Sequence, residues 1–257
     1  MLTILPTKPD ASRCVVKAEA YMSRAMPPTL EASPDLRRRT LESTAKFIVA
    51  LAVIIMLPSL SLTYWQGWLY WALFAAFTVG GSLYFLAHDP ALVERRLAVG
   101  PTAETERSQK LIMTAASVCV VLLFAMPGLD HLFGWSHVPA WLVIAADIAV
   151  ILSYVLVCYV LSVNSYAAAT ITTGADQPVI STGPYAWVRH PMYSDALLMF
   201  GLTPLALGSY WALLLLIPLA AVFAWRLLDE ERVLRRDLPG YNAYCDKVRS
   251  RLVPGAW

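Results

Sequence analysis

Apolar residues are gathered into six long runs along this chain, at residues 47–64, 68–87, 111–128, 139–163, 193–208 and 211–228. A helix of about 20 apolar residues is needed to cross the hydrocarbon core of a bilayer. The last two runs are joined by only Ser209 and Tyr210, which predicts an antiparallel helix hairpin with arms near the lower limit for crossing. The pattern therefore predicts an all-α, multi-pass transmembrane helical bundle of about five or six spans that ends in this short hairpin.

Basic residues are sorted to one side of this series of runs. All 20 Lys and Arg residues lie before the first run, in the 88–110 and 164–192 loops, or from Arg226 onward, and the 65–67, 129–138 and 209–210 connections contain none. Loops rich in Lys and Arg stay on the cytoplasmic side of a membrane. We therefore expect both termini, both long loops and an amphipathic C-terminal cap to be cytosolic.

The composition agrees with a membrane protein and narrows its partners. Hydrophobic residues make up 58% of the chain and charged residues 15%, with a mean hydropathy of +0.56. The net charge of +2 comes from basic residues that flank apolar runs, which predicts attraction to anionic membrane lipids and no binding of nucleic acid. The four cysteines are scattered, with no Cys-x-x-Cys pair and no histidine at ligand spacing, so we expect neither disulfides nor a metal site.

Three regions follow from these patterns. Residues 1–46 mix Pro, Arg, Glu and Ser without a sustained period and are expected to form a cytosolic tail, to which no function is assigned. Residues 47–163 are expected to form transmembrane helices 1–4. Residues 164–257 contain a polar loop, the helix hairpin and the C-terminal cap, and they hold both clusters of residues suited to chemistry.

The first cluster is the run from Gly183 to Tyr193. Gly183 with Pro184 marks a turn, and Pro191 prevents a helix from running back into Arg189. These bends are expected to hold Tyr185, Arg189, His190 and Tyr193 close together. A plain membrane-entry turn with interfacial aromatics explains this run equally well when it is taken alone.

The second cluster lies at the end of the last run. Arg226 and Glu230 are four residues apart and share one helix face, and the same spacing pairs Glu231 with Arg235. We interpret Asp229, Glu231 and Arg235 as a salt-bridged helix end. A charged pair at the edge of the hydrocarbon is costly and often marks a substrate or cofactor path, so Arg226 and Glu230 are functional candidates. The hairpin returns Glu230 to the face where His190 lies.

Together these clusters resemble a known family. The ordered motifs Gly-x-Tyr-x-x-Val-Arg-His-Pro-x-Tyr, Arg-x-x-x-Glu-Glu, Gly-Tyr-x-x-Tyr and a terminal Arg-Leu-x-Pro resemble the isoprenylcysteine carboxyl methyltransferases and their prokaryotic relatives, in the phospholipid methyltransferase-like superfamily. The resemblance covers roughly residues 164–257, and residues 1–163 match only in being apolar helices. It implies an integral-membrane methyltransferase that uses S-adenosylmethionine without a Rossmann domain. No Gly-x-Gly-x-x-Gly motif follows a strand in this chain, in agreement with that implication.

The resemblance also implies roles for individual residues. Arg226 would face the carboxylate of the acceptor, and Glu230 would close the cofactor site. The remaining cofactor-binding residues implied by the motifs are Gln177, Pro178, Val179, Ile180, Tyr185, His190, Pro191, Met192 and Tyr193. For Arg189 two roles stay open, either bracing the bend through loop carbonyls, which we favour, or stabilising charge in the pocket.

The residue types suit methyl transfer. Tyr185 and Tyr193 offer aromatic faces to a sulfonium cation, Glu230 offers a carboxylate to ribose or ammonium groups, and His190 offers a donor to the methionine carboxylate. A carboxylate acceptor with a pKa near 4 is already ionised and needs no general base. Asp147, in the middle of the fourth run, is either a functional acid at bilayer depth or a hydrogen-bonded structural residue.

Other functions remain open at this stage. The favoured prediction is carboxyl O-methylation of an isoprenylcysteine-like, prenylated or other lipid-like acceptor. A phospholipid or amine N-methyltransferase would keep the cofactor wall and change the acceptor. An NADPH-dependent sterol-type reductase shares an Arg-His-Pro-x-Tyr region but ranks lower, because this chain has the Glu230-Glu231 pair. A non-enzymatic membrane protein also ranks lower.

Overall fold

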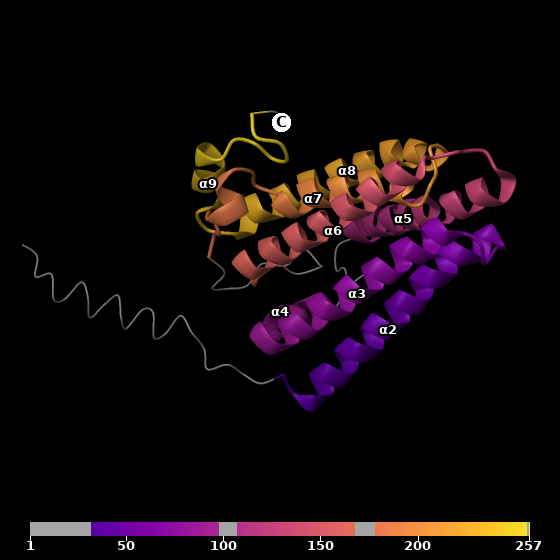
Figure 1. The fold of residues 1–257 in the computed structure, drawn as a ribbon. Helices are drawn as coiled ribbons and strands as arrows, with labels where there is room; N and C mark the ends of the chain where they lie inside the picture. The colour runs from indigo at the N-terminus through magenta and orange to yellow at the C-terminus, as the bar shows by residue number, and fades with distance from the viewer. Residues whose placement is uncertain (1–31, 98–106, 168–177, 256) are drawn as a thin grey trace, which may run out of the picture.

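The computed structural model describes residues 32–97, 107–167, 178–255 and 257, and its elements are helices, as predicted (Figure 1). They are, in chain order, α2 (Pro34–Met56), η1 (Leu57–Ser59), α3 (Trp65–His88), α4 (Pro90–Leu97), α5 (Arg107–Phe133), α6 (Ala140–Val163), η2 (Gly183–Ala186), α7 (Pro191–Ala206), η3 (Trp211–Leu215), α8 (Leu216–Asp237) and α9 (Tyr241–Lys247).

Five of the helical segments are long and apolar enough to cross a membrane. They are Pro34–Ser59, Trp65–His88, Arg107–Phe133, Ala140–Val163 and Trp211–Asp237. The predicted 193–208 span corresponds to α7, which has 16 residues. At about 1.5 Å per residue, α7 is shorter than the roughly 30 Å hydrocarbon core. The protein is therefore an all-α, multi-pass membrane protein, and its described residues contain five full-length spans and one short helix beside them.

Helix α2 begins at Pro34, earlier than the apolar run at residues 47–64 indicated. Ser33 is its N-cap and accepts a hydrogen bond from the backbone N–H of Leu36 at 3.1 Å, Pro34 occupies the first turn, and Asp35 adds a negative charge there. Residues 34–46, which were expected to belong to a cytosolic tail, are thus the polar first part of α2. Hydropathy alone missed this start because a helix can extend well beyond its apolar portion.

The end of the bundle without basic residues is closed by a hydrogen-bonded cap. The Tyr64 hydroxyl donates to the backbone carbonyl of Leu207 at 2.6 Å, which ties the start of α3 to the end of α7. Asp130, near the end of α5, accepts from the backbone N–H of Ser136 at 2.7 Å and from the Ser209 hydroxyl. The short α7 therefore reaches the same end as its long neighbours, so its missing length lies at the other end, beside the His190 turn.

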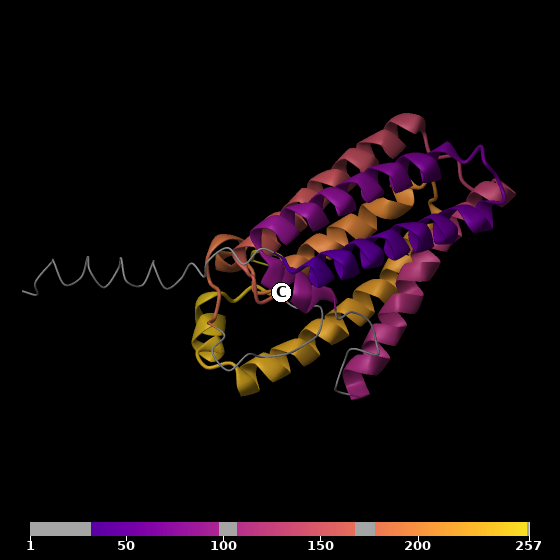
Figure 2. The same ribbon diagram turned by 90° about the horizontal axis from the view of Figure 1, so that it is seen from below.

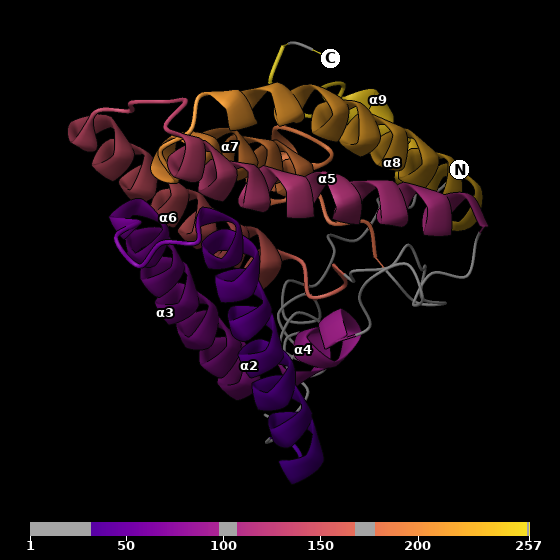
Figure 3. The same cartoon turned by 90° about the vertical axis from the view of Figure 1, so that its right-hand side faces the viewer.

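The helices diverge toward that other end. α6 and α7 pack side by side, whereas α2 and α3 diverge from α5 and α8, and α4 lies between the diverging ends (Figures 2 and 3). Leu92 and Val93 of α4 pack with Phe85, Leu86 and Leu161 beneath it. On the opposite side, α9 packs against Val179 and Leu234. Residues of α4, α9 and the 178–190 loop line a cavity at this end of the bundle.

Candidate functional site

The turn before α7 is built by the residues that the sequence singled out. Gly183 adopts a positive φ of +56°, which few residues other than glycine tolerate, and it opens the single 3-10 turn η2. Pro191 is the first residue of α7 and His190 is its N-cap position. The chain therefore changes direction on both sides of Arg189, as predicted.

Arg189 is buried and fully engaged with protein atoms. Its Nε donates to Glu231 Oε1 at 2.7 Å, and its Nη1 donates to the backbone carbonyls of Val248 and Arg249, each at 2.8 Å. These contacts agree with the bracing role that we favoured for Arg189. Its direct participation in catalysis stays a prediction.

Residues 248–252, which we call the C-terminal strap, run alongside the turn. The backbone N–H groups of Arg189 and His190 donate to the carbonyls of Ser250 and Arg251, each at 3.0 Å. The Ser194 hydroxyl donates to the Leu252 carbonyl at 2.7 Å. The strap thus fixes the backbone of the turn from outside, which gives a structural role to the terminal Arg-Leu-x-Pro motif.

Glu231 is the centre of this arrangement, and its predicted partner was wrong. It is 4% exposed and contacts His190 Nε2 at 3.3 Å and Arg251 Nε at 3.1 Å, besides Arg189. Arg235, the expected partner, donates instead to Asn242 Oδ1 at 3.1 Å. Helix spacing allows the Glu231–Arg235 pair, but the Glu231 side of α8 is buried against Arg189, whereas Arg235 is exposed.

Glu230 and Arg226 lie on the neighbouring face of α8. The Tyr193 hydroxyl donates to Glu230 Oε2 at 2.7 Å, so the two predicted clusters meet directly. Arg226 Nη1 donates to Gln109 Oε1 at 2.6 Å, and Gln109 Nε2 donates to Asp229 Oδ2. Gln109, 1% exposed near the start of α5, was not predicted, because no motif or spacing distinguishes it from other residues before an apolar run.

These side chains line a cavity of about 600 Å³, within the range of about 300–1,000 Å³ that is usual for ligand sites. The predicted site residues on its wall are Pro178, Val179, Ile180, Tyr185, Arg189, His190, Pro191, Met192, Tyr193, Arg226 and Glu230. Gln177 lies outside the described residues. The structure therefore brings together all the predicted site residues that it describes.

The remaining wall is of two kinds. Apolar side chains of α2, α5, α7 and α8 line one part, namely Phe47, Met113, Ala116, Val120, Phe200 and Phe223. Arg96 of α4 and Asn164, at the end of α6, line the part near Tyr185. Neither was predicted as a site residue, because neither belongs to a recognisable motif. The cavity thus joins a polar region to an apolar one.

Tyr185 is held in the polar region as a neutral phenol. Burial raises the pKa of its hydroxyl, and Asn164 Nδ2 donates a hydrogen bond to the hydroxyl oxygen at 3.0 Å. The Tyr244 hydroxyl donates to the backbone carbonyl of Tyr185 at 2.7 Å and fixes the residue from the α9 side. The ring of Tyr185 is therefore a rigid part of the cavity wall.

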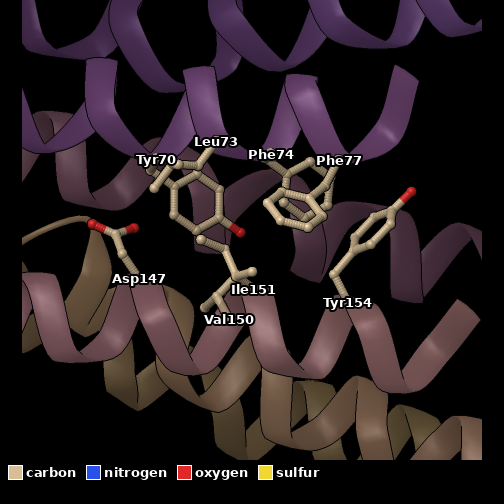
Figure 4. A pocket seen from close by; sticks show the side chains of 8 residues that line it. All are labelled: Tyr70, Leu73, Phe74, Phe77, Asp147, Val150, Ile151 and Tyr154. Carbon is tan, nitrogen blue, oxygen red and sulfur yellow. The ribbon is translucent and has the colours of Figure 1, made fainter. Parts of the chain in front are cut away.

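Asp147 lies away from this cavity. It is 3% exposed and borders a void of about 10 Å³ between α3 and α6, with Tyr70, Phe74 and Val150 among its neighbours (Figure 4). Its Oδ2 has no hydrogen-bond partner among the described residues. The predicted hydrogen bond to a neighbouring Ser, Thr or Tyr is thus not made by this oxygen. Over the described ranges, no group of three His, Cys, Asp or Glu side chains is placed to hold a metal ion.

Comparison with known proteins supports the resemblance. The family model described as phospholipid methyltransferase matches residues 141–238, from the start of α6 to the end of α8. Comparison with curated proteins gives no match. The matched residues include Tyr185, His190, Tyr193, Arg226 and Glu230, all of which line the cavity. Over these residues the chain is similar to the phospholipid methyltransferase family, in agreement with the resemblance found in the sequence.

Proposed function

We propose that this protein transfers a methyl group from S-adenosylmethionine to a lipid-like acceptor inside the cavity. The observation that carries the proposal is the contact between Tyr193 and Glu230, which joins the His190 turn to the acidic end of α8 along one cavity wall. We also propose that the basic end of the bundle, and the site with it, faces the cytosol, because loops rich in Lys and Arg are retained there.

The residues on the wall fit S-adenosylmethionine, which supplies an electrophilic methyl group on a sulfonium cation. The faces of Tyr185 and Tyr193 offer cation–π contacts, and both rings are held by hydrogen bonds to Asn164 and Glu230. The Glu230 carboxylate can accept hydrogen bonds from ribose hydroxyls or an ammonium group. Val179 and Ile180 provide apolar surface for an adenine ring.

The apolar part of the cavity supports an acceptor with a hydrocarbon chain. Phe47, Met113 and Phe223 come from three different helices and meet on this wall. Arg226 lines the same cavity, and its guanidinium donates a hydrogen bond to Gln109. A guanidinium binds a carboxylate through two parallel hydrogen bonds, so Arg226 is suited to orient an acceptor carboxylate.

Carboxyl O-methylation places the smallest chemical demand on these side chains. A carboxylate is ionised at neutral pH, so catalysis rests on aligning the two reactants and excluding water, and alignment alone contributes up to about 7–11 kcal/mol. An amine must first lose a proton. The basic groups on the wall are already engaged, Glu230 with Tyr193 and His190 with Glu231. We therefore favour a carboxylate acceptor, such as an isoprenylcysteine.

Phospholipid N-methylation is the second candidate, and the description of the matching family model favours it. The test is to incubate the purified protein with methyl-labelled S-adenosylmethionine and either a farnesyl-cysteine analogue or a total lipid extract. Label in a base-labile product of the analogue supports ester formation. Label in a base-stable phospholipid would replace carboxylate with amine as the acceptor, and no labelled product in either arm would reject both candidates.

Variants of the two α8 residues test the roles within the site. Glu230→Ala is expected to weaken binding of the methyl donor, because it removes the carboxylate from the wall near Tyr193. Arg226→Ala is expected mainly to raise the KM for the acceptor. Equal donor affinity in the wild type and Glu230→Ala would show that these roles are assigned wrongly.

A further inference from the structure

Arg96 is a basic residue of the cavity that the methyl-transfer roles above do not use. It lies in the last turn of α4 and lines the polar part of the cavity. Its Nη1 donates to the backbone carbonyl of Ala167 at 3.2 Å. Within the described ranges, no Asp or Glu carboxylate lies within the 4 Å of an ion pair with Arg96. It therefore differs from Arg189, which is paired with Glu231.

The surroundings of Arg96 do not neutralise its charge. Its interacting neighbours in this region are the phenols of Tyr154 and Tyr185, and burial raises the pKa of Tyr185. Burial also lowers the pKa of Arg96 itself, but a guanidinium stays protonated at any physiological pH. A partly buried cation without an anion is costly, and an anionic ligand group removes that cost. The cavity thus offers a binding position for an oxyanion.

His190, which was expected to donate to the methionine carboxylate, has one ring nitrogen engaged by Glu231. Its Nε2 lies 3.3 Å from Glu231 Oε1, so the proton on this nitrogen points to Glu231. Arg226 is bonded to Gln109 and is assigned above to the acceptor carboxylate. Arg96, by contrast, lies beside Tyr185 in the part of the wall assigned to the methyl donor.

From this arrangement we infer that Arg96 binds the carboxylate of the methyl donor. The inference rests on the proposed function. It adds a donor-binding residue from α4, which lies outside the matched residues 141–238. The phosphate of a lipid acceptor has the same oxyanion chemistry, so the experiment must separate the two sources.

The experiment measures equilibrium binding of S-adenosylmethionine and of its decarboxylated form to the purified full chain. Arg96→Gln is expected to weaken binding of S-adenosylmethionine roughly 10- to 100-fold, the range for a lost charge-assisted hydrogen bond. The decarboxylated form is expected to bind the wild type and Arg96→Gln within about twofold of each other, since it lacks the group that Arg96 binds. Arg96→Lys, which keeps the charge, is expected to show a smaller loss with the same ligand selectivity.

Arg95→Gln is the matched control, because it removes the same charge from the neighbouring position of α4. Arg95 donates to the Ser165 carbonyl and stacks on Tyr166 with 5.2 Å between its guanidinium carbon and the ring centroid, and it does not line the cavity. Its replacement is expected to leave donor affinity unchanged. An equal loss in Arg95→Gln and Arg96→Gln would mean that both arginines only support the 164–167 segment, and would overturn the inference.

The other outcomes are also decisive. If Arg96→Gln loses affinity equally for S-adenosylmethionine and for its decarboxylated form, Arg96 does not bind the donor carboxylate. The same follows if Arg96→Gln keeps its donor affinity but has a raised KM for a phospholipid acceptor. Either result overturns the carboxylate assignment and leaves the proposed function standing. Failure of the wild-type chain to bind either donor form would instead overturn the proposed function, and this inference with it.

Discussion

Replacement of Glu231 by alanine removes the carboxylate that holds the His190 turn, the C-terminal strap and α8 together. Glu231 accepts hydrogen bonds from Arg189 Nε at 2.7 Å and Arg251 Nε at 3.1 Å, and the side chains of Glu231 and Arg189 are each 5% exposed. Without Glu231, Arg189 is a buried cation whose remaining contacts are the carbonyls of Val248 and Arg249.

The expected cost of this change is large. Removing one partner of a buried ion pair destabilises a protein by about 3–5 kcal/mol, and the two remaining carbonyl contacts place this case near the lower end. In a chain of about this size, 1 kcal/mol shifts the Tm by roughly 2–4 °C, so a loss of about 3 kcal/mol lowers the Tm by roughly 6–12 °C. Thermal unfolding of the detergent-purified protein measures this shift.

Asp237→Ala is the matched control. Asp237 is also an acidic residue of α8 in an ion pair, but its partner Arg236 is 66% exposed. An exposed pair contributes at most about 1 kcal/mol, which corresponds to a shift of at most roughly 2–4 °C. A Tm of Glu231→Ala within about 2 °C of the wild-type Tm would show that the buried network around Glu231 does not stabilise the site.

Three further predictions concern stability elsewhere. Tyr244→Phe should lower the free energy of unfolding by about 1–3 kcal/mol, because it leaves the buried Tyr185 carbonyl without its donor. Burial raises the pKa of Tyr244 above its unfolded value, so the stabilisation by the neutral phenol is fully present below about pH 10 and is lost only above it. Urea unfolding at pH 6 and at pH 9 should therefore give the same difference in stability between the wild type and Tyr244→Phe. Gly128→Ala should destabilise the protein by about 1–3 kcal/mol, because a Cβ would lie 2.9 Å from the Ile55 carbonyl oxygen. Gly80→Ala, where a Cβ would meet no atom within 4 Å, should be neutral or slightly stabilising in the same thermal assay. Equal shifts of the Tm in the two variants would contradict the close packing of α5 on η1. Asp147→Leu should leave methyl transfer unchanged and keep or raise the Tm, because leucine suits the apolar lining of this void; a more than about tenfold loss of activity in a folded variant would instead give Asp147 a functional role.

The sequence predicted the features that depend on local pattern. The apolar runs gave the spans, and the glycine and prolines around residues 183–191 gave the bent turn, because each of these signals acts over a few residues. The meeting of Tyr193 with Glu230 was also predictable, since a hairpin of two short arms returns α8 to the face that α7 left. The start of α2 was readable from Ser33 and Pro34, although hydropathy did not show it.

The contacts that depend on packing between distant elements were not predictable. Helix spacing allowed Glu231 to pair with Arg235, and only the burial of one face of α8 directs it to Arg189. Gln109 and Arg96 come from α5 and α4, whose sequences carry no motif, and they reach the cavity because the helices diverge there. A single sequence does not encode this divergence in any local pattern.

Equilibrium binding of S-adenosylmethionine and of NADPH to the purified full chain shows whether the cavity holds a methyl donor. We expect saturable binding of one S-adenosylmethionine per chain, no binding of NADPH, and a marked loss of S-adenosylmethionine affinity in Glu230→Ala. Binding of NADPH, or the absence of S-adenosylmethionine binding by a folded wild-type protein, would contradict the claim that the cavity between the His190 turn and α8 holds a methyl donor.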